Sequence, residues 1–237
     1  MVSDNDPYEA YIKELILKQE GLLGVTGRSS IVFEKAINSG NVIADCMIFN
    51  ENKGAIGIEI KTAHDTVRRL NKQLRGYSKV CRYIYVLCSD SQVEHVLQVI
   101  KDNNYSYVGI ISYDMFEDDV VLGIYKEAVE CPYRTAYSLT NILWKQEVIA
   151  LLSQLRSPSK YVAREKNYTS IEWRDKQYCH RLGNAASRKL RKSDLIRNLI
   201  GIIGEKETER LVNRYFAMET IYPEKTIKYY HFLNKEH

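Results

Sequence analysis

Apolar and polar positions alternate with two different periods along the first half of the chain. Apolar side chains at helical spacing predict helices at residues 7–20, 64–79 and 91–102. Residues 30–37 form a short apolar segment that fits either a strand or a helix. Continuous or alternating apolar runs predict strands at residues 42–49, 55–62, 83–88, 107–113 and 118–126. This mixture indicates an α/β fold, in which helices flank a sheet.

The rest of the chain has mainly helical spacing. The pattern predicts an amphipathic helix at residues 138–155 and two more at about 184–203 and 205–218, separated at Gly204. We therefore expect two parts: an α/β core at residues 1–135 and a mainly helical, basic region at residues 136–237.

Two interpretations of the last two helices stay open. They could form a helix-turn-helix that binds DNA, or a packing or dimerisation element that would make the protein a homodimer. The residues expected at the DNA in the first case are Arg188, Lys189, Arg191 and Lys192.

The composition also indicates the compartment in which the protein resides. The chain has 237 residues, of which 45% are hydrophobic, and no apolar stretch is long enough to span a bilayer. Its first residues are acidic and polar, unlike a signal peptide. Five cysteines without a CxxC pair argue against a disulfide framework or a structural zinc site. These features predict a cytoplasmic protein with no membrane partner.

The positive charge is concentrated in one segment. Residues 156–197 contain 12 lysines and arginines against 4 acids, a net charge of +8, although the whole chain carries only +4. Tyrosines and a tryptophan lie among these cations, and such a mixture suits a polyanion such as DNA. A solvated basic connector explains the segment equally well.

The most informative element is a predicted hairpin whose loop, residues 50–54, is centred on Asn52. In that register Asp45 lies opposite Glu59. Strand alternation then separates two faces. One face is apolar, with Val42, Ala44, Cys46, Ile48, Ile56, Ile58 and Ile60. The other face carries Asp45, Gly57, Glu59 and Lys61.

Two carboxylates on adjacent strands repel each other unless a cation lies between them, and a divalent ion with oxygen ligands suits that position. An exposed hairpin face with a Glu–Lys pair is the alternative. The next predicted helix carries a row of cations beside an apolar stripe, and these cations could guide a phosphate backbone or could simply be solvated.

The order of these residues resembles a known nuclease motif. Asp45, then Glu59-Ile60-Lys61 closing an apolar strand, then Gln73 and Tyr77 four residues apart, is similar to the PD-(D/E)xK nuclease superfamily. The similarity is to its branch with a RecB-type QxxxY motif and to small bacterial and phage restriction-like proteins. It covers about residues 30–90, and Ala44 stands where the proline of the motif would be.

The resemblance implies a restriction-endonuclease-like core with a central mixed sheet, and a Mg²⁺ or Mn²⁺ ion. Asp45 and Glu59 would hold the ion with the backbone carbonyl of Ile60, and Lys61 would position or activate the attacking water. Glu34 would match an upstream metal-binding glutamate. Contacts to nucleic acid would come from Arg68, Arg69, Lys72, Gln73 and Tyr77.

Two functions are therefore expected. The first is a Mg²⁺-dependent DNA nuclease that hydrolyses phosphodiester bonds at Asp45, Glu59 and Lys61. The alternative is a non-catalytic protein that binds nucleic acid or another partner on a nuclease-like scaffold.

Overall fold

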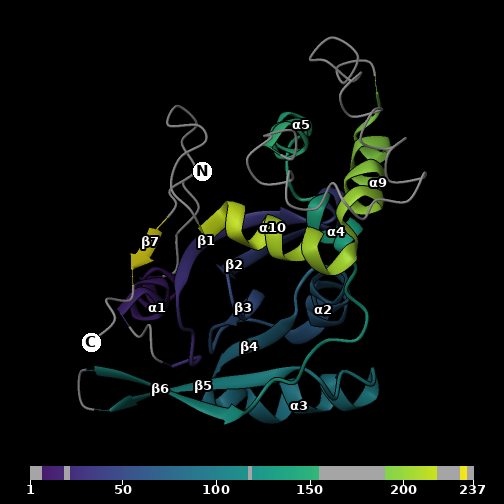
Figure 1. Cartoon of the computed structure of the whole chain (residues 1–237). Coiled ribbons are helices and arrows are strands. Elements are labelled where there is room, and N and C mark those ends of the chain that lie inside the picture. Colours follow the sequence, from purple (N-terminus) through teal and green to yellow (C-terminus); the bar gives the residue numbers. More distant parts are fainter. Residues whose placement is uncertain (1–6, 19–21, 117–118, 155–189, 218–229, 234–237) are drawn as a thin grey trace, which may run out of the picture. The chain divides into compact units, whose positions relative to one another are not determined.

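The computed structural model describes residues 7–18, 22–116, 119–154, 190–217 and 230–233 (Figure 1). The chain divides into two compact units. The first unit comprises Met1–Arg134 together with Asn213–His237, and the second unit comprises Thr135–Val212. The chain thus leaves the first unit at Thr135 and returns to it at Asn213.

The first unit is built on one mixed sheet of seven strands among the described residues. The strands lie in the order β6-β5-β4-β3-β2-β1-β7 (Figure 1). β3, β4 and β5 are parallel, and the remaining neighbours pair antiparallel. The strands are β1 (Arg28–Ile37), β2 (Val42–Asn50), β3 (Gly54–Lys61), β4 (Tyr83–Ser89), β5 (Gly109–Phe116), β6 (Asp119–Lys126) and β7 (Tyr230–Leu233).

Helices connect the parallel strands. α2 (Leu70–Ser78), which follows the short 3₁₀ helix η2 (Val67–Arg69), joins β3 to β4. α3 (Val93–Asp102), which follows η3 (Asp90–Gln92), joins β4 to β5. Parallel neighbours need crossovers of this kind, because the chain must return to the same end of the sheet.

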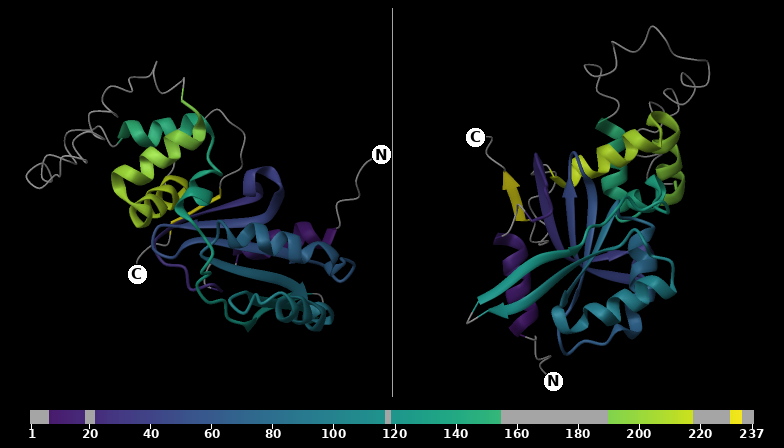
Figure 2. Two further views of the ribbon diagram at one scale, coloured as in Figure 1. Left: turned by 90° about the vertical axis from the view of Figure 1, so that its right-hand side faces the viewer. Right: turned by 90° about the horizontal axis from the view of Figure 1, so that it is seen from below.

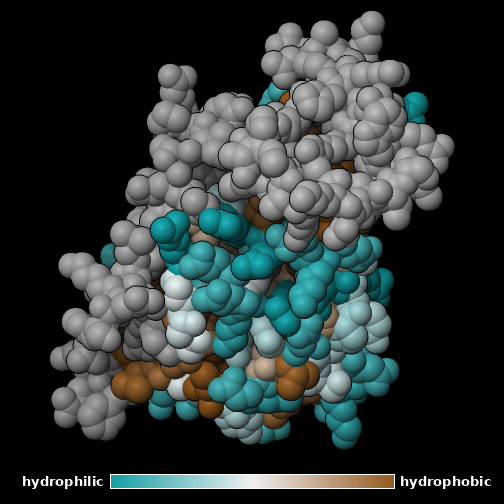
Figure 3. All heavy atoms as spheres, viewed as in Figure 1, coloured by the Kyte–Doolittle hydropathy of each residue, from teal (hydrophilic) through white to brown (hydrophobic). Residues whose placement is uncertain are grey.

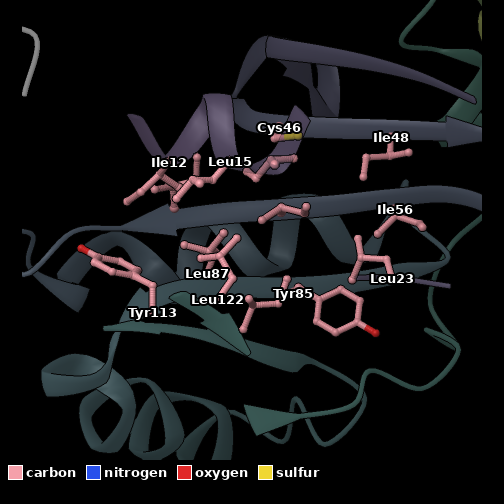
Figure 4. Packing of buried hydrophobic residues seen from close by; sticks show 14 of the residues in the cluster. Ile12, Leu15, Leu23, Cys46, Ile48, Ile56, Tyr85, Leu87, Tyr113 and Leu122 are labelled. Atoms are coloured by element: carbon pink, nitrogen blue, oxygen red, sulfur yellow. The ribbon is translucent and has the colours of Figure 1, made fainter. Parts of the chain in front are cut away.

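The two faces of the sheet are covered by different helices. α1 (Pro7–Lys18) packs against one face, where Ile12 and Leu15 belong to the same buried cluster as Cys46, Ile56 and Leu87 (Figure 4). α2 and α3 cover the opposite face, as the right-hand view of Figure 2 shows. The core therefore lies in two layers, one on each side of the strands.

The predicted hairpin register is confirmed. Cys46 pairs with Ile58 and Asn50 with Gly54, so the loop is centred on Asn52. Cys46, Ile48, Ile56, Ile58 and Ile60 all lie in the core beneath α1, as expected for one face of the hairpin. Val42 departs from that face, since its side chain lies against Gly76 of α2.

The second unit is helical in its described residues. It contains α4 (Ala136–Thr140), α5 (Lys145–Gln154), α9 (Lys192–Ile203) and α10 (Glu205–Ala217) up to Val212. α9 packs on α4 and α5. Leu195, Ile196 and Leu199 supply its buried side.

The single helix predicted at residues 138–155 is wrong. The chain breaks between α4 and α5, and the Glu147 carboxylate accepts a hydrogen bond from the Trp144 N–H at the start of the second helix. This side-chain cap satisfies a backbone donor that a continuous helix would have bonded to a carbonyl, so it favours a new helix start.

The mixed α/β fold with a central mixed sheet flanked by helices is confirmed. The segment at residues 30–37, open between strand and helix, is a strand, β1. β7 was not predicted. None of the helices in the described part of the chain is long and apolar enough to cross a membrane.

Candidate functional site

Four of the predicted site residues come together beneath α2. Asp45 comes from β2, Glu59 and Lys61 from β3, and Tyr77 from α2. The β2–β3 pairing extends from the loop as far as Cys46 and Ile58. The cluster lies just beyond that point, where the backbone groups of the two strands need other partners.

Side chains of the cluster supply those partners. The Tyr77 hydroxyl accepts a hydrogen bond from the Asp45 N–H at 3.0 Å and donates one to the Ile58 carbonyl at 3.2 Å. The Asp45 carboxylate accepts from the Ile60 N–H at 2.8 Å. Tyr77 and Asp45 therefore tie β2 to β3 where the regular ladder ends.

Glu59 and Lys61 form a buried ion pair. Their side chains are 0% and 7% exposed, and the Lys61 Nζ lies 2.6 Å from the Glu59 Oε1. The second carboxylate oxygen of Glu59 is buried and has no hydrogen-bond partner among the described residues.

The environment of Glu59 favours its neutral form. Burial raises the pKa of the Glu59 carboxyl to about 8, and the negative charge of Asp45 acts in the same direction. The charge of Lys61 and its hydrogen bond to Glu59 oppose this rise. Glu59 therefore holds its proton to a higher pH than an ordinary glutamate.

The packing over the cluster is tight. Gly57 lies on β3 directly under Tyr77, and a Cβ added there would approach the Tyr77 Cδ1 to 2.3 Å. Gln73 is partly buried, and its Oε1 has no partner among the described residues. Tyr77 is 0% exposed, so it braces the strands and offers no surface to nucleic acid.

Glu34 does not join the cluster's hydrogen bonds. It occupies an unpaired position of β1, between Phe33 and Lys35, with a positive φ of 56°. Its side chain is 74% exposed and forms an ion pair with Lys13 at 3.2 Å. The pairs on either side, Phe33 with Cys46 and Lys35 with Ala44, keep one register, so Glu34 lies across from an equally unpaired position of β2 and neither strand gains a residue.

The described residues contain no group of three or more His, Cys, Asp or Glu side chains arranged to hold a metal ion. Asp45 and Glu59 already bond within the protein, to the Ile60 N–H and to Lys61. The expected Mg²⁺ or Mn²⁺ site, including the Ile60 carbonyl, stays a prediction.

The second feature is a row of cations on η2 and α2, here called the α2 basic row. Leu70, Leu74 and Tyr77 are fully buried and fix the rotation of the helix. The opposite side therefore stays in solvent, and Figure 3 shows hydrophilic residues covering the surface where Figure 1 places α2. The row consists of the exposed Arg68, Arg69, Lys72, Arg75 and Lys79.

The basic residues predicted at the last helices are only partly described. Arg188 and Lys189 lie outside the described residues. Arg191 is exposed and precedes the first turn of α9. Lys192 donates a hydrogen bond to the Asn141 carbonyl at 2.6 Å, so its charge also serves packing within the second unit.

Comparison with known proteins gives the chain a family. A model of the family described as Bacteriophage P4 protein cII matches residues 2–219. The chain belongs to this cII family. A search of curated proteins finds no match to the chain. The family match covers nearly the whole chain, both units included.

Membership of the cII family corrects three predictions. The assignment to the PD-(D/E)xK superfamily is wrong, because the matching family is a different one and spans far more than residues 30–90. The predicted nuclease activity and the classification as an enzyme are wrong with it. No metal-binding group of acids supports them in the described part of the cII-family chain.

The physical reason for this error is that the motif residues also serve the fold. Asp45 and Tyr77 complete the backbone hydrogen bonds of β2 and β3, and Glu59 and Lys61 pair in the core. Arg75 and Lys79 belong to the row of cations expected on this helix, although they were not among the residues expected to contact nucleic acid. Their helical spacing from Arg68 and Lys72 indicates that they lie on the same exposed side.

Proposed function

We propose that this cII-family chain is a non-catalytic DNA-binding protein and that the α2 basic row is its contact surface. The supporting observation is the placement of five exposed cations on one short helical segment whose other side is fixed in the core. Clustered cations on one face attract the phosphate backbone of DNA, because they replace its counterions.

The charges around the row favour an anionic partner. Residues 66–89 contain six lysines and arginines and no acid. Within the described residues, no ion pair neutralises Arg68, Arg69, Lys72 or Arg75. Lys79 donates a hydrogen bond to the neutral Oδ1 of Asn38 at 3.2 Å, which leaves its charge uncompensated. The row therefore keeps its positive field for a ligand.

The described helices of the second unit offer less charge. α10 carries three acids and three bases along its length, so its field largely cancels. α9 adds two cations and one acid. The strongly basic stretch at residues 156–197 is a second source of attraction for DNA, and its sequence supports the same function.

In this proposal, the buried cluster of Asp45, Glu59, Lys61 and Tyr77 has a structural role. Its groups bond to one another and to the backbone of β2 and β3, so they hold the sheet on which α2 rests. No reaction step is assigned to Asp45, Glu59 or Lys61.

Binding is tested by fluorescence anisotropy of a labelled DNA fragment in low salt and EDTA. The double variant Lys72→Glu/Arg75→Glu reverses two charges of the row. We expect it to bind at least about tenfold more weakly than the wild type, because each phosphate contact adds to the affinity. The matched control, Lys101→Glu/Lys206→Glu, reverses two exposed charges on α3 and α10 and is expected to keep the wild-type affinity.

Two results would overturn the proposal. One is a wild-type protein that binds no DNA, and the other is equal affinity of the row variant and the control variant. Binding of the wild type to vesicles of anionic phospholipid, with no binding to DNA, would replace DNA by a membrane surface. The thermal unfolding of each variant is measured alongside, so that loss of binding is separated from loss of fold.

A further inference from the structure

The geometry of the α2 basic row points to one class of DNA. We infer that the row binds duplex DNA through its phosphate backbone, without reading the base sequence. This inference rests on the proposed DNA-binding function and specifies its ligand.

The row follows one short helical segment. Arg68 and Arg69 lie in η2, Lys72 and Arg75 lie on α2, and Lys79 follows the last residue of α2. Lys72 and Arg75 are three residues apart, so they lie on one side of α2. At the rise of an α-helix, the segment from Arg68 to Lys79 is roughly 16 Å long. A row of cations of that length suits the regular array of phosphates along a duplex.

The amide side chains of α2 are not available to distinguish bases. Asparagine and glutamine are the usual readers of adenine. The Asn71 Oδ1 accepts a hydrogen bond from the Tyr105 hydroxyl at 2.8 Å, and the Gln73 Oε1 is buried. Neither amide can therefore present its full donor and acceptor pair to a base edge. Contacts from lysine and arginine to phosphates position a protein on DNA but carry no sequence information.

The row also lacks a surface for unpaired bases. Proteins that bind single strands stack the bases on exposed aromatic rings. Tyr77, the aromatic residue of α2, is fully buried. The exposed aromatic residues described in the first unit, Tyr125 and Tyr133, belong to β6 and the segment after it. A single strand on the row would gain charge contacts but no stacking.

The test measures how much the row contributes to the affinity for each DNA ligand. A neutral double variant, Lys72→Ala/Arg75→Ala, and the wild type are titrated with a duplex, with its single strand, and with a second duplex of scrambled sequence. The loss of affinity relative to the wild type is compared between ligands, because residues 156–197 also carry cations and aromatic rings that could bind DNA themselves. Lys101→Ala/Lys206→Ala is the matched control.

We expect the variant to lose at least about tenfold in affinity for both duplexes, equally, and less than about threefold for the single strand. The slope of log affinity against log salt should become shallower by about 1.8 units on duplex DNA, since each lost phosphate contact removes about 0.9. The control should keep the wild-type slope.

The outcomes separate the two proposals. An equal or larger loss on the single strand, or a loss that differs between the two duplex sequences, overturns the duplex inference and leaves DNA binding through α2 intact. No loss on any ligand overturns the proposed role of α2, and the duplex inference falls with it.

Discussion

A buried carboxyl that favours its proton links the stability of this protein to pH. The pKa of Glu59 is raised from 4.5 to about 8 in the folded protein, chiefly by burial. Between these two values the folded state holds a proton that the unfolded state releases. The free energy of unfolding therefore falls as pH rises from about 4.5 to about 8, and above that range this contribution is fully lost.

Replacing Glu59 by glutamine should remove this pH dependence. Glu59→Gln imitates the protonated carboxyl and keeps an oxygen for Lys61, so its free energy of unfolding should change less between pH 5 and pH 8 than that of the wild type. Urea unfolding at a series of pH values measures the difference. The same change at the exposed Glu94 on α3 is the control. Parallel pH curves for the wild type and Glu59→Gln would contradict the assignment of this pH dependence to Glu59.

A second residue-scale prediction concerns Glu34, which has a positive φ of 56° at an unpaired position of β1. Side chains with a Cβ pay about 1 kcal/mol in that conformation, and glycine does not. Glu34→Gly should therefore be more stable than Glu34→Ala by about 1 kcal/mol. Both variants lose the ion pair with Lys13, so their difference in chemical unfolding isolates the backbone effect.

The exposed helical position Glu94 is the control, because the stability difference between its glycine and alanine variants should have the opposite sign. There glycine should be less stable than alanine by about 1 kcal/mol, because it gives up more backbone freedom on folding. An advantage of alanine at Glu34 as well would show that this position does not hold a positive φ in solution.

The sequence predicted the hairpin well and its surroundings less well. The turn residues around Asn52 and strict apolar alternation set the register, and the structure has that register. The burial of the polar face of the hairpin was not predictable, because it depends on how α2 packs over Gly57. The positive φ of Glu34 has no signal in a short apolar segment that fitted strand or helix.

At the scale of elements, Gly57 decides how closely α2 approaches β3. A Cβ at this position would come within 2.3 Å of Tyr77 and 2.7 Å of the Cys81 Sγ. Gly57→Ala should therefore lower the free energy of unfolding by about 1–3 kcal/mol, the usual cost of overpacking. Thermal and urea unfolding measure this loss.

Gly123 in β6 is the matched control for Gly57. A Cβ there would meet no heavy atom within 4 Å, so Gly123→Ala should be neutral or stabilising by up to about 1 kcal/mol. Equal effects of the two substitutions would mean that α2 does not lie against β3 as described.

The Tyr77 hydroxyl is predicted to hold β2 and β3 together beyond their ladder. Tyr77→Phe leaves the Asp45 N–H and the Ile58 carbonyl without this partner, which should cost about 1–3 kcal/mol. Hydrogen exchange provides the local measurement, since the Asp45 amide should lose protection. Tyr125→Phe, at a 55% exposed position, should change neither quantity. A protected Asp45 amide in Tyr77→Phe would rule out this role.

At the scale of the whole molecule, the first unit is built from two separate stretches of the chain. The second unit, Thr135–Val212, lies between two stretches that both belong to the first. β7, close to the C-terminus, pairs with β1 at one edge of the sheet. Such long-range pairing leaves no local signal in a four-residue strand, which explains why the sequence did not reveal β7. The division of function between residues 1–135 and 136–237 stays a prediction, as does a homodimer.

The return of the chain to the first unit can be tested at Phe216, near the end of α10. Its ring stacks on Phe49 of β2 with centroids 4.0 Å apart, and it is only 3% exposed. Phe216→Ala should lower the free energy of unfolding by about 3–5 kcal/mol, as for other buried phenylalanines. It should also speed hydrogen exchange in β2, far away in the sequence. Arg214→Ala, exposed on the same turn, should stay within about 0.5 kcal/mol of the wild type. If Phe216→Ala matches Arg214→Ala, then the stacking of Phe216 on Phe49 does not hold the end of α10 to the core of the first unit.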